Sequence, residues 1–240
     1  MDRLAAITLL HRLHRLPSPV GELPDGLLPL LQRRGASLMS ATVLPFAPGV
    51  TFDEAAHRYF VDGKELPSVT HVLQAVGMVD YTFSTEYAME RGSAAHKAIH
   101  FDVEGDLDES DLDPRLAPYV LAARCLRRDI KAETVGVERR LYSPTLRYAG
   151  TLDYLFKIEG VLSILDWKCS QSPAPATALQ VAAYAAAYEE ETGEKIRRRY
   201  CAALSPRGTY ELIPYTDRDD ISVFRSALAV YHWRSERGLL

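Results

Sequence analysis

Three charged residues near the middle of the chain have the types and the spacing of a metal-dependent hydrolytic site. Asp166 and Lys168 stand two residues apart at the end of the apolar segment Val161–Leu165. Residues i and i+2 of a strand point to the same side, so these two side chains are expected to project together. Asp153 lies upstream, in a segment that also reads as a strand. If the two strands pair through a turn at Glu159-Gly160, both carboxylates lie on one face of the sheet.

Two carboxylates held this close repel each other unless a cation lies between them or one of them is protonated. Mg²⁺ suits the position because it needs only one or two protein carboxylates besides water and substrate phosphate. The alternative is a surface salt bridge between Asp166 and Lys168, with Asp153 near a turn. An apolar strand disfavours ionisable groups that have neither a partner nor a purpose, which favours the metal site.

Periodicity predicts the elements that would position these residues. We expect a hairpin over 57–66, because its Asp62-Gly63 dipeptide favours a type I′ turn, followed by a helix from Ser68 to Val76 that ends at Gly77. Three strands over 134–142, 148–158 and 161–168 are expected to form an antiparallel meander. The remaining predicted elements are a helix over 84–101, interrupted or tightened near Gly92, helices over 114–131, 177–191 and 217–237, and strands over 197–204 and 209–215. This order predicts an α/β fold with a mixed β-sheet flanked by α-helices.

Residues 17–50 are rich in proline and glycine, which predicts a linker around one short helix over 27–34. We therefore expect an N-terminal extension and linker over 1–50 and one catalytic domain over 51–240. Residues 4–16 read as a short, mildly basic helix. An organellar transit peptide is the alternative there, and the low serine content disfavours it.

The composition is that of an ordinary globular protein, with 47% hydrophobic and 25% charged residues. A net charge of -4 gives no global sign of a nucleic-acid partner. Much of the negative charge lies in the block 102–113, which reads as a solvated loop, so a basic groove elsewhere stays open. The three cysteines form no C-x-x-C pair, which disfavours a disulfide framework or structural zinc and favours a cytoplasmic setting. No segment is apolar enough to predict a membrane span.

Four motifs resemble those of PD-(D/E)XK nucleases of the RecB-like branch in their order and approximate spacing. The four motifs are Arg91-Gly92-Ser-Ala-Ala-His96, Gly150-Thr-Leu-Asp153, Ile164-Leu-Asp166-Trp-Lys168-Cys-Ser170 and Gln180-Val-Ala-Ala-Tyr184. The resemblance extends over roughly residues 57–215. Within that branch, Leu66-Pro-Ser-Val-Thr70 and the last motif look most like the mitochondrial genome maintenance exonucleases and related phage and bacterial exonucleases. The resemblance implies a restriction-endonuclease-like fold.

The resemblance also implies a ligand set for the metal. His96, Asp153 and Asp166 would bind it, together with the main-chain carbonyl of Trp167. Mg²⁺ is the expected ion, and the imidazole ligand leaves room for Mn²⁺. Lys168 would orient and help deprotonate the attacking water, or neutralise charge on the phosphate.

Further residues would contact nucleic acid or support the site. Gln180 and Tyr184 share a helix face, and packing over the sheet is their alternative role. Glu138 precedes Asp153 in the neighbouring strand, where several relatives carry an additional carboxylate, and an exposed strand position is its alternative. The same supporting group includes Ser170, Arg197 and Arg199, the two arginines as phosphate contacts.

The function implied by the resemblance is that of a metal-dependent DNA exonuclease acting on single-stranded DNA or free ends, in replication, recombination or repair. The alternatives are an endonuclease, a double-strand end-resecting exonuclease, and a catalytically silent DNA-binding module. DNA is the expected partner, without a membrane, and the sequence leaves the oligomeric state open. Some relatives carry an iron–sulfur cluster on four cysteines, and we expect none here. A bacterial or phage-encoded cytoplasmic protein is expected, ahead of an organellar matrix protein.

Overall fold

The computed structural model describes residues 49–53, 56–79 and 85–240. The chain divides into two compact units, Met1–Ser40 and Ala41–Leu240, and all the described residues belong to the second. The helices predicted over 4–16 and 27–34 lie outside the described residues. The proposed boundary between an extension over 1–50 and a domain over 51–240 therefore stays a prediction.

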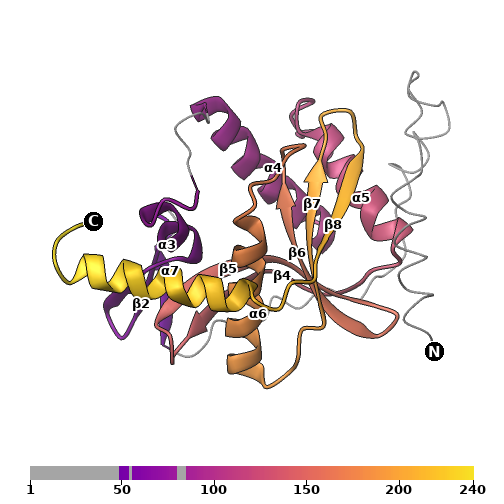
Figure 1. Cartoon of the computed structure of the whole chain (residues 1–240). Coiled ribbons are helices and arrows are strands. Elements are labelled where there is room, and N and C mark those ends of the chain that lie inside the picture. Colours follow the sequence, from indigo (N-terminus) through magenta and orange to yellow (C-terminus); the bar gives the residue numbers. More distant parts are fainter. Residues whose placement is uncertain (1–48, 54–55, 80–84) are drawn as a thin grey trace. The chain divides into compact units, whose positions relative to one another are not determined.

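A five-stranded mixed sheet forms the centre of the fold (Figure 1). Its strand order follows the sequence: β4 (Glu133–Ser143), β5 (Tyr148–Ile158), β6 (Val161–Lys168), β7 (Arg198–Leu204) and β8 (Tyr210–Tyr215). β6 and β7 run parallel, and all the other neighbours are antiparallel. The predicted meander is confirmed, with β5 and β6 at the predicted bounds. The helix between β6 and β7 supplies the crossover that a parallel pair requires.

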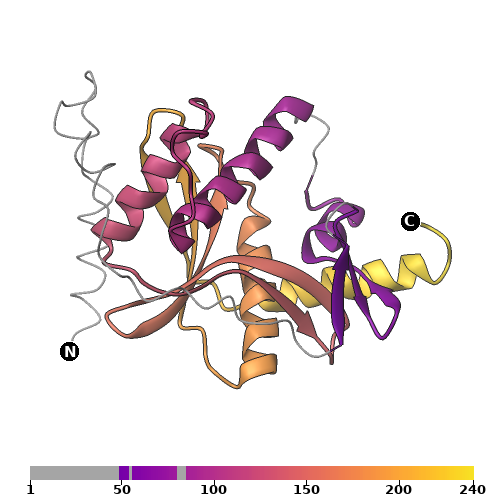
Figure 2. The ribbon, with the colours of Figure 1, turned by 180° about the vertical axis from the view of Figure 1, so that it is seen from behind.

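Helices cover both faces of this sheet, as Figures 1 and 2 show from opposite sides. α4 (Glu86–Glu104) and α5 (Ala117–Asp129) lie on one face, and α6 (Thr177–Thr192) and α7 (Asp220–Ser235) lie on the other. The predicted α/β class is thus confirmed. α6 ends at Gly193, whose φ of 76° is the left-handed conformation expected of a glycine that closes a helix.

A second, three-stranded sheet precedes the first helix of the described chain. It consists of β1 (Val50–Asp53), β2 (Arg58–Val61) and β3 (Lys64–Leu66), and α3 (Val69–Ala75) follows it. The predicted hairpin is confirmed, since Asp62 and Gly63 both have positive φ, at 50° and 75°. The sequence-based interpretation missed β1: Val50 was assigned to a linker, but it pairs with Val61 and is buried.

Buried side chains pack on both faces of the sheet. Trp167, Tyr154, Phe156 and Tyr200 form an aromatic cluster, in which Tyr154 stacks on Phe156 and the other ring pairs are tilted, and all four side chains are almost completely buried. Aliphatic residues of β5 and β6 pack with α3, α6 and α7 in the largest hydrophobic cluster. This packing holds the end of β6 rigidly, and Asp166 and Lys168 lie at that end.

Two details of α4 correct the sequence-based interpretation. The helix passes Gly92 without interruption and reaches Glu104, so the acidic block begins inside a helix and not in a solvated loop. The carboxylate of Asp102 is 6% exposed and forms ion pairs with Arg124 and Arg127 of α5. A buried carboxylate needs such partners, and these pairs join the two helices. Within the described part of the chain, no helix has the length and apolar character required to cross a bilayer.

Candidate active site

The site begins where β5 and β6 separate. Their pairing runs from Ile158 and Val161 to Tyr154 and Leu165. Beyond that point the carboxylate of Asp153 accepts a hydrogen bond from the backbone N–H of Trp167, at 2.8 Å. The pairing of β6 with β7 on its other side continues to Lys168. β5 and β6 therefore stop pairing at the position of the two predicted aspartates, Asp153 and Asp166.

Asp166 and Lys168 lie side by side on β6, as the strand periodicity predicts. The carboxylate of Asp166 is 1% exposed, and its Oδ2 lies 2.7 Å from Nζ of Lys168. This oxygen has no hydrogen-bond partner of good geometry in the described structure, although it forms that ion pair. Trp167 points to the opposite face, where its ring centre lies 5.6 Å from that of Tyr154 in a tilted arrangement. The end of β6 therefore presents one buried anion and one cation to the same space.

α6 holds the ammonium group of Lys168 in place. Nζ donates a hydrogen bond to Oε1 of Gln180 at 3.1 Å, and Nε2 of Gln180 donates to the hydroxyl of Tyr184 at 3.0 Å. The ring of Tyr184 packs against Gly150, where a Cβ atom would lie 2.5 Å from Cε1 of the ring. Gln180 and Tyr184 thus extend from α6 toward Lys168 and also pack over the sheet, and their predicted role toward nucleic acid or the metal site stays a prediction.

His96 and Glu138 reach the other side of Asp153. Nδ1 of His96, on α4, lies 3.4 Å from Oδ2 of Asp153. Glu138 has a φ of 46° in β4, in the register position opposite Asp153. One potential ligand atom from each of these three residues lies within 4.8 Å of the others. Glu138 is therefore part of the cluster and not an exposed strand position.

The electrostatics of the cluster show an excess of buried negative charge. Burial raises the pKa of Glu138 to about 8, and the carboxylates of Asp153 and Asp166 contribute to this rise. Burial and the nearby Asp166 also raise the pKa of Asp153 to about 6. The pKa of Lys168 is raised as well: burial acts to lower it, but Asp166 and Asp153 outweigh burial. The carboxylates are thus held close together at a cost that a divalent cation would remove.

The donor set fits a divalent metal ion. Carboxylate oxygens are the ligands that Mg²⁺ and Mn²⁺ prefer, and one imidazole is compatible with Mn²⁺. The buried Oδ2 of Asp166 still has lone pairs that accept no hydrogen bond. The side chain of His96 is 26% exposed and that of Lys168 is 28% exposed, so solvent and substrate can reach the cluster.

Arg91 is a candidate site residue to which the sequence-based interpretation gave no role. It lies on α4, where its guanidinium carbon is 5.8 Å and 5.6 Å from the ring centres of Tyr87 and Tyr119. Its charge also acts on Cys169, the residue after Lys168. Its Nε is buried without a hydrogen-bond partner among the described residues. Arg91 is the first residue of the Arg91-to-His96 motif. The motif alone does not reveal that its guanidinium lies near Cys169, which follows the end of β6.

The remaining predicted residues lie outside the cluster or act through the main chain. Ser170 is exposed, and its hydroxyl accepts a hydrogen bond from the N–H of Ser172 at 3.3 Å. Arg197 and Arg199 lie at the opposite end of β7: Arg198 pairs with Ser163, whereas Ala203 pairs with Lys168. Arg199 forms an ion pair with Asp220 at 3.0 Å. Their contact with DNA and the ligand role of the Trp167 carbonyl stay predictions.

A mixed sheet with a D-x-K pair at the end of one strand and an aspartate opposite on its neighbour is the arrangement predicted from the PD-(D/E)XK resemblance. Human mitochondrial genome maintenance exonuclease 1 is 26% identical to this chain, over 53% of this chain and 45% of the human protein. The match thus spans about half the length of that relative. This similarity supports the assignment of a PD-(D/E)XK-like nuclease.

No family model matches the chain. Among solved structures, the crystal structure of an alkaline exonuclease (LHK-Exo) from Laribacter hongkongensis is 14% identical, with a TM-score of 0.42. That match covers 72% of this chain and 88% of the exonuclease chain.

Proposed function

We propose that the protein is a metal-dependent deoxyribonuclease that hydrolyses phosphodiester bonds, acting as an exonuclease on single-stranded DNA or free DNA ends. The observation that carries the proposal is the group of His96, Glu138 and Asp153, which could hold a metal ion, together with the neighbouring ion pair of Asp166 and Lys168. A purely structural salt bridge would not explain three carboxylates gathered around a separation in the sheet, with the pKa values of two of them raised.

Each residue of the cluster has a defined task in this proposal. His96, Asp153 and Asp166 would hold the metal ion, with Glu138 as an additional ligand. The bound ion would supply Lewis-acid activation of the phosphodiester and lower the pKa of a water molecule. Lys168 would orient that water and offset negative charge on the phosphate. Gln180 would keep Nζ of Lys168 directed to this position through the 3.1 Å hydrogen bond.

The reaction would be direct hydrolysis without a covalent intermediate. The attacking water gives up a proton as its oxygen forms the new bond to phosphorus, the P–O bond to the leaving nucleotide breaks, and the leaving oxygen takes up a proton, so that one water molecule is consumed. In this step Lys168 would orient the water beside the metal ligand Asp166, whose Oδ2 lies 2.7 Å from Nζ of Lys168. Arg91, whose guanidinium lies over the rings of Tyr87 and Tyr119, would bind a non-reacting phosphate of the same strand.

The experiment that tests the proposal uses end-labelled linear and circular DNA, single- and double-stranded, with Mg²⁺ or Mn²⁺. The wild-type protein is expected to degrade linear single strands and to spare circles, which separates an exonuclease from an endonuclease. EDTA and Lys168→Ala should abolish degradation, whereas Lys157→Ala should leave it unchanged, because Lys157 is exposed on β5 away from the cluster. Degradation that persists in both EDTA and Lys168→Ala would contradict the proposal.

A further inference from the structure

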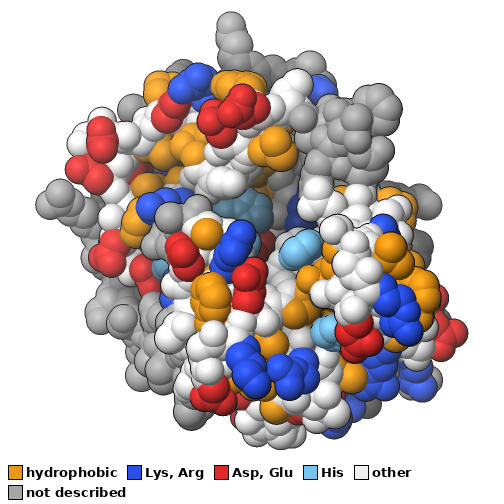
Figure 3. Space-filling view, turned by 90° about the vertical axis from the view of Figure 1, so that its left-hand side faces the viewer, with side chains coloured by type: hydrophobic (Ala, Val, Ile, Leu, Met, Phe, Trp, Pro, Cys, Tyr) orange, Lys and Arg blue, Asp and Glu red, His pale blue; other side chains and the backbone are white. Residues whose placement is uncertain are grey.

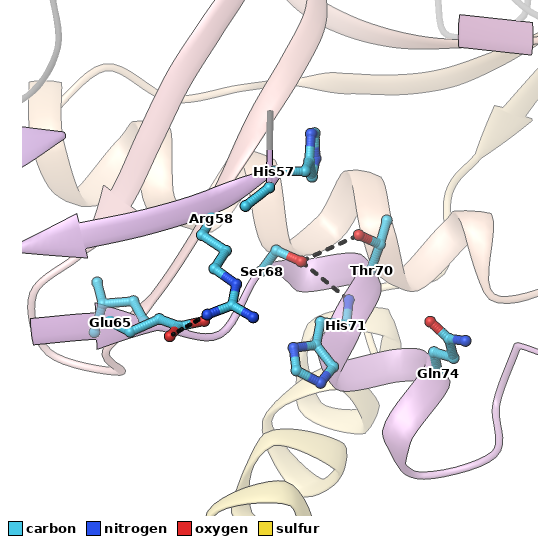
Figure 4. Close-up of a pocket in the computed structure, with 9 residues that line it drawn as sticks. His57, Arg58, Glu65, Ser68, Thr70, His71 and Gln74 are labelled. Atoms are coloured by element: carbon cyan, nitrogen blue, oxygen red, sulfur yellow. Dashed lines mark hydrogen bonds and ion pairs between the residues drawn. The ribbon is translucent and has the colours of Figure 1, made fainter. Parts of the chain in front are cut away.

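A cavity lies between the β2–β3 hairpin and α3, outside the carboxylate cluster. Its volume is about 300 Å³. Figure 4 shows the residues that line it. The hairpin side contributes His57, Arg58 and Glu65, and α3 contributes Thr70, His71 and Gln74. These three helix residues form the polar face of α3, whose Val69, Val72 and Leu73 are buried on the other side. Figure 3 shows the side of the molecule that carries α3, where histidine side chains border a hollow.

The cavity is structurally connected to the strand that carries Asp153. Ser68, at its base, bridges to Ala149 of β5, and the hydroxyl of Tyr59 hydrogen-bonds to Oγ1 of Thr151 at 2.7 Å. Asp153 lies four positions after Ala149 on this strand, or about 13 Å away at the rise of a β-strand. A strand of DNA bound at the metal site would therefore reach the cavity within a few nucleotides.

Arg140 interacts with both the carboxylate cluster and the cavity. Its guanidinium carbon is 4.6 Å from the ring centre of Phe52, which packs on Tyr59 and His57. Its positive charge acts on Glu138 in the cluster and on His57 in the cavity wall. A basic side chain at this place is suited to a backbone phosphate that joins a nucleotide in the cavity to the reacting one.

The lining suits a nucleobase better than a phosphate. Burial, and then the charge of Arg140, lower the pKa of His57, so its ring is neutral at pH 7. Among the described lining residues, the one carboxylate, Glu65, lies 3.4 Å from Arg58. What remains is an amide, hydroxyls and imidazole rings, which offer hydrogen bonds and a stacking surface. A cavity at the lower end of the ~300–1,000 Å³ range of ligand sites has room for one nucleotide and none for a paired duplex.

We propose that this cavity receives one unpaired nucleotide of the substrate strand and thereby selects single-stranded DNA. The inference rests on the proposed nuclease function and deepens it. Thr70 and Gln74 would hydrogen-bond the base edge, and His57 or His71 would contact its face. A base-paired nucleotide would carry its partner into the hairpin or α3, so duplex would enter only after local melting.

The test measures binding of a fluorescein-labelled single-stranded oligothymidylate to Asp166→Asn protein, which keeps the strand uncut. The double substitution Thr70→Val/Gln74→Ala is expected to weaken binding about 5–50-fold, the range of a lost base contact. Thr216→Val is the matched control. Thr216 precedes the N-terminal end of α7, whereas the cavity residue His71 contacts Tyr231 in the C-terminal half of α7, so Thr216 lies away from the cavity.

Oligonucleotides with a single abasic residue, moved one position at a time, show whether a base is what binds. An abasic residue at one particular position should weaken binding to the Asp166→Asn protein. An abasic residue at the same position should have no effect once Thr70 and Gln74 are also substituted. Equal affinities for all these oligonucleotides, or an abasic effect that persists in the substituted protein, would overturn the inference. Melting temperatures within a few degrees of each other confirm that the variants are folded.

Hydrolysis of bis(p-nitrophenyl) phosphate separates the cavity from the reaction, because this small diester has no base to place there. With Asp166 intact, Thr70→Val/Gln74→Ala should hydrolyse it at the wild-type rate while cleaving single-stranded DNA with a raised KM. A wild-type protein that hydrolyses neither the diester nor DNA would overturn the proposed function. A wild-type protein that hydrolyses both, with no change in the variant, would overturn the cavity inference alone.

Discussion

The side chain of Asp153 accepts a hydrogen bond from the backbone N–H of Trp167 at 2.8 Å, at the point where β5 and β6 stop pairing. One oxygen of Asp153 thus replaces a main-chain acceptor of the sheet and also lies 3.4 Å from Nδ1 of His96. The carboxylate is fixed by the fold before any metal ion binds. Such preorganisation is what a ligand needs when the ion and a substrate phosphate must be held together.

Asp153→Asn and Asp153→Ala should separate these two tasks. The amide oxygen of asparagine can still accept the hydrogen bond from Trp167, so the free energy of unfolding should stay within about 1 kcal/mol of the wild-type value. Alanine leaves the buried N–H without a partner and should cost about 1–3 kcal/mol. Both variants should lose metal binding by calorimetry. Wild-type metal affinity in Asp153→Asn would show that this carboxylate is not a ligand.

Arg91 should affect DNA binding more than the chemical step. We expect Arg91→Ala to raise KM for single-stranded DNA about tenfold or more, and to reduce the magnitude of the slope of log affinity against log salt concentration by about one phosphate contact. Arg91→Lys should recover only part of the affinity, because an ammonium group lacks the planar stacking of a guanidinium on Tyr87 and Tyr119. An unchanged salt dependence of DNA binding in Arg91→Ala would show that Arg91 does not contact a phosphate of the substrate.

The raised pKa values make the stability of the metal-free protein depend on pH in a defined direction. Glu138 and Asp153, with pKa values of about 8 and about 6, bind protons in the folded state that the unfolded state has released. Their contribution to stability therefore falls as pH rises from 5 to 8.5, by up to about 1.4 kcal/mol per pH unit for each proton. Metal ions need the deprotonated ligands, so metal affinity should rise over the same range.

Thermal unfolding in EDTA and in Mn²⁺ between pH 5 and 8.5 measures both effects. Glu138→Gln removes one titrating group and should flatten the EDTA curve between pH 6.5 and 8.5. The increase in melting temperature caused by Mn²⁺ should be largest at high pH. If that increase were larger at pH 5 than at pH 8, protons and metal ions would not compete for these carboxylates.

Gly150 is required by the close approach of Tyr184 and not by its backbone conformation. A Cβ atom there would lie 2.5 Å from the tyrosine ring, so Gly150→Ala should destabilise the protein by about 1–3 kcal/mol. The displaced ring should also disturb Gln180 and reduce the cleavage rate. Combining Gly150→Ala with Tyr184→Ala should cost less than the sum of the two single changes, as a double-mutant cycle by denaturant unfolding would show. Additive effects would mean that the two residues do not interact.

Periodicity and turn chemistry were sufficient to predict most of the fold. β5 and β6 have the predicted bounds because their apolar runs are terminated by strong turn residues, and the hairpin follows from Asp62-Gly63. β1 was missed because its four residues, Val50–Asp53, carry too little alternation to be distinguished from a linker. The acidic block was misinterpreted at Asp102 because its partners Arg124 and Arg127 lie on another helix, and sequence spacing does not reveal that contact.

The same contrast holds for the candidate site. Asp166 and Lys168 follow from the two-residue period of one strand, and Asp153 from the next strand of the meander. Glu138 could be suggested only by analogy, because its left-handed backbone conformation is set by the tertiary structure. Arg197 and Arg199 looked favourable as a basic run, but the parallel register of β6 and β7 places them at the far end of the sheet. A dense run of basic residues in the sequence did not indicate where in the fold those residues lie relative to Lys168.

Anomalous X-ray scattering from crystals of the protein soaked in Mn²⁺ tests the central claim most directly. One Mn²⁺ peak is expected within about 2.0–2.6 Å of ligand atoms from His96, Asp153 and Asp166, on the side of Asp153 that faces Glu138. Asp166→Asn crystals treated in the same way should show a much weaker peak. A strong peak elsewhere, with none among these residues, would contradict the proposed metal site and the nuclease mechanism built on it.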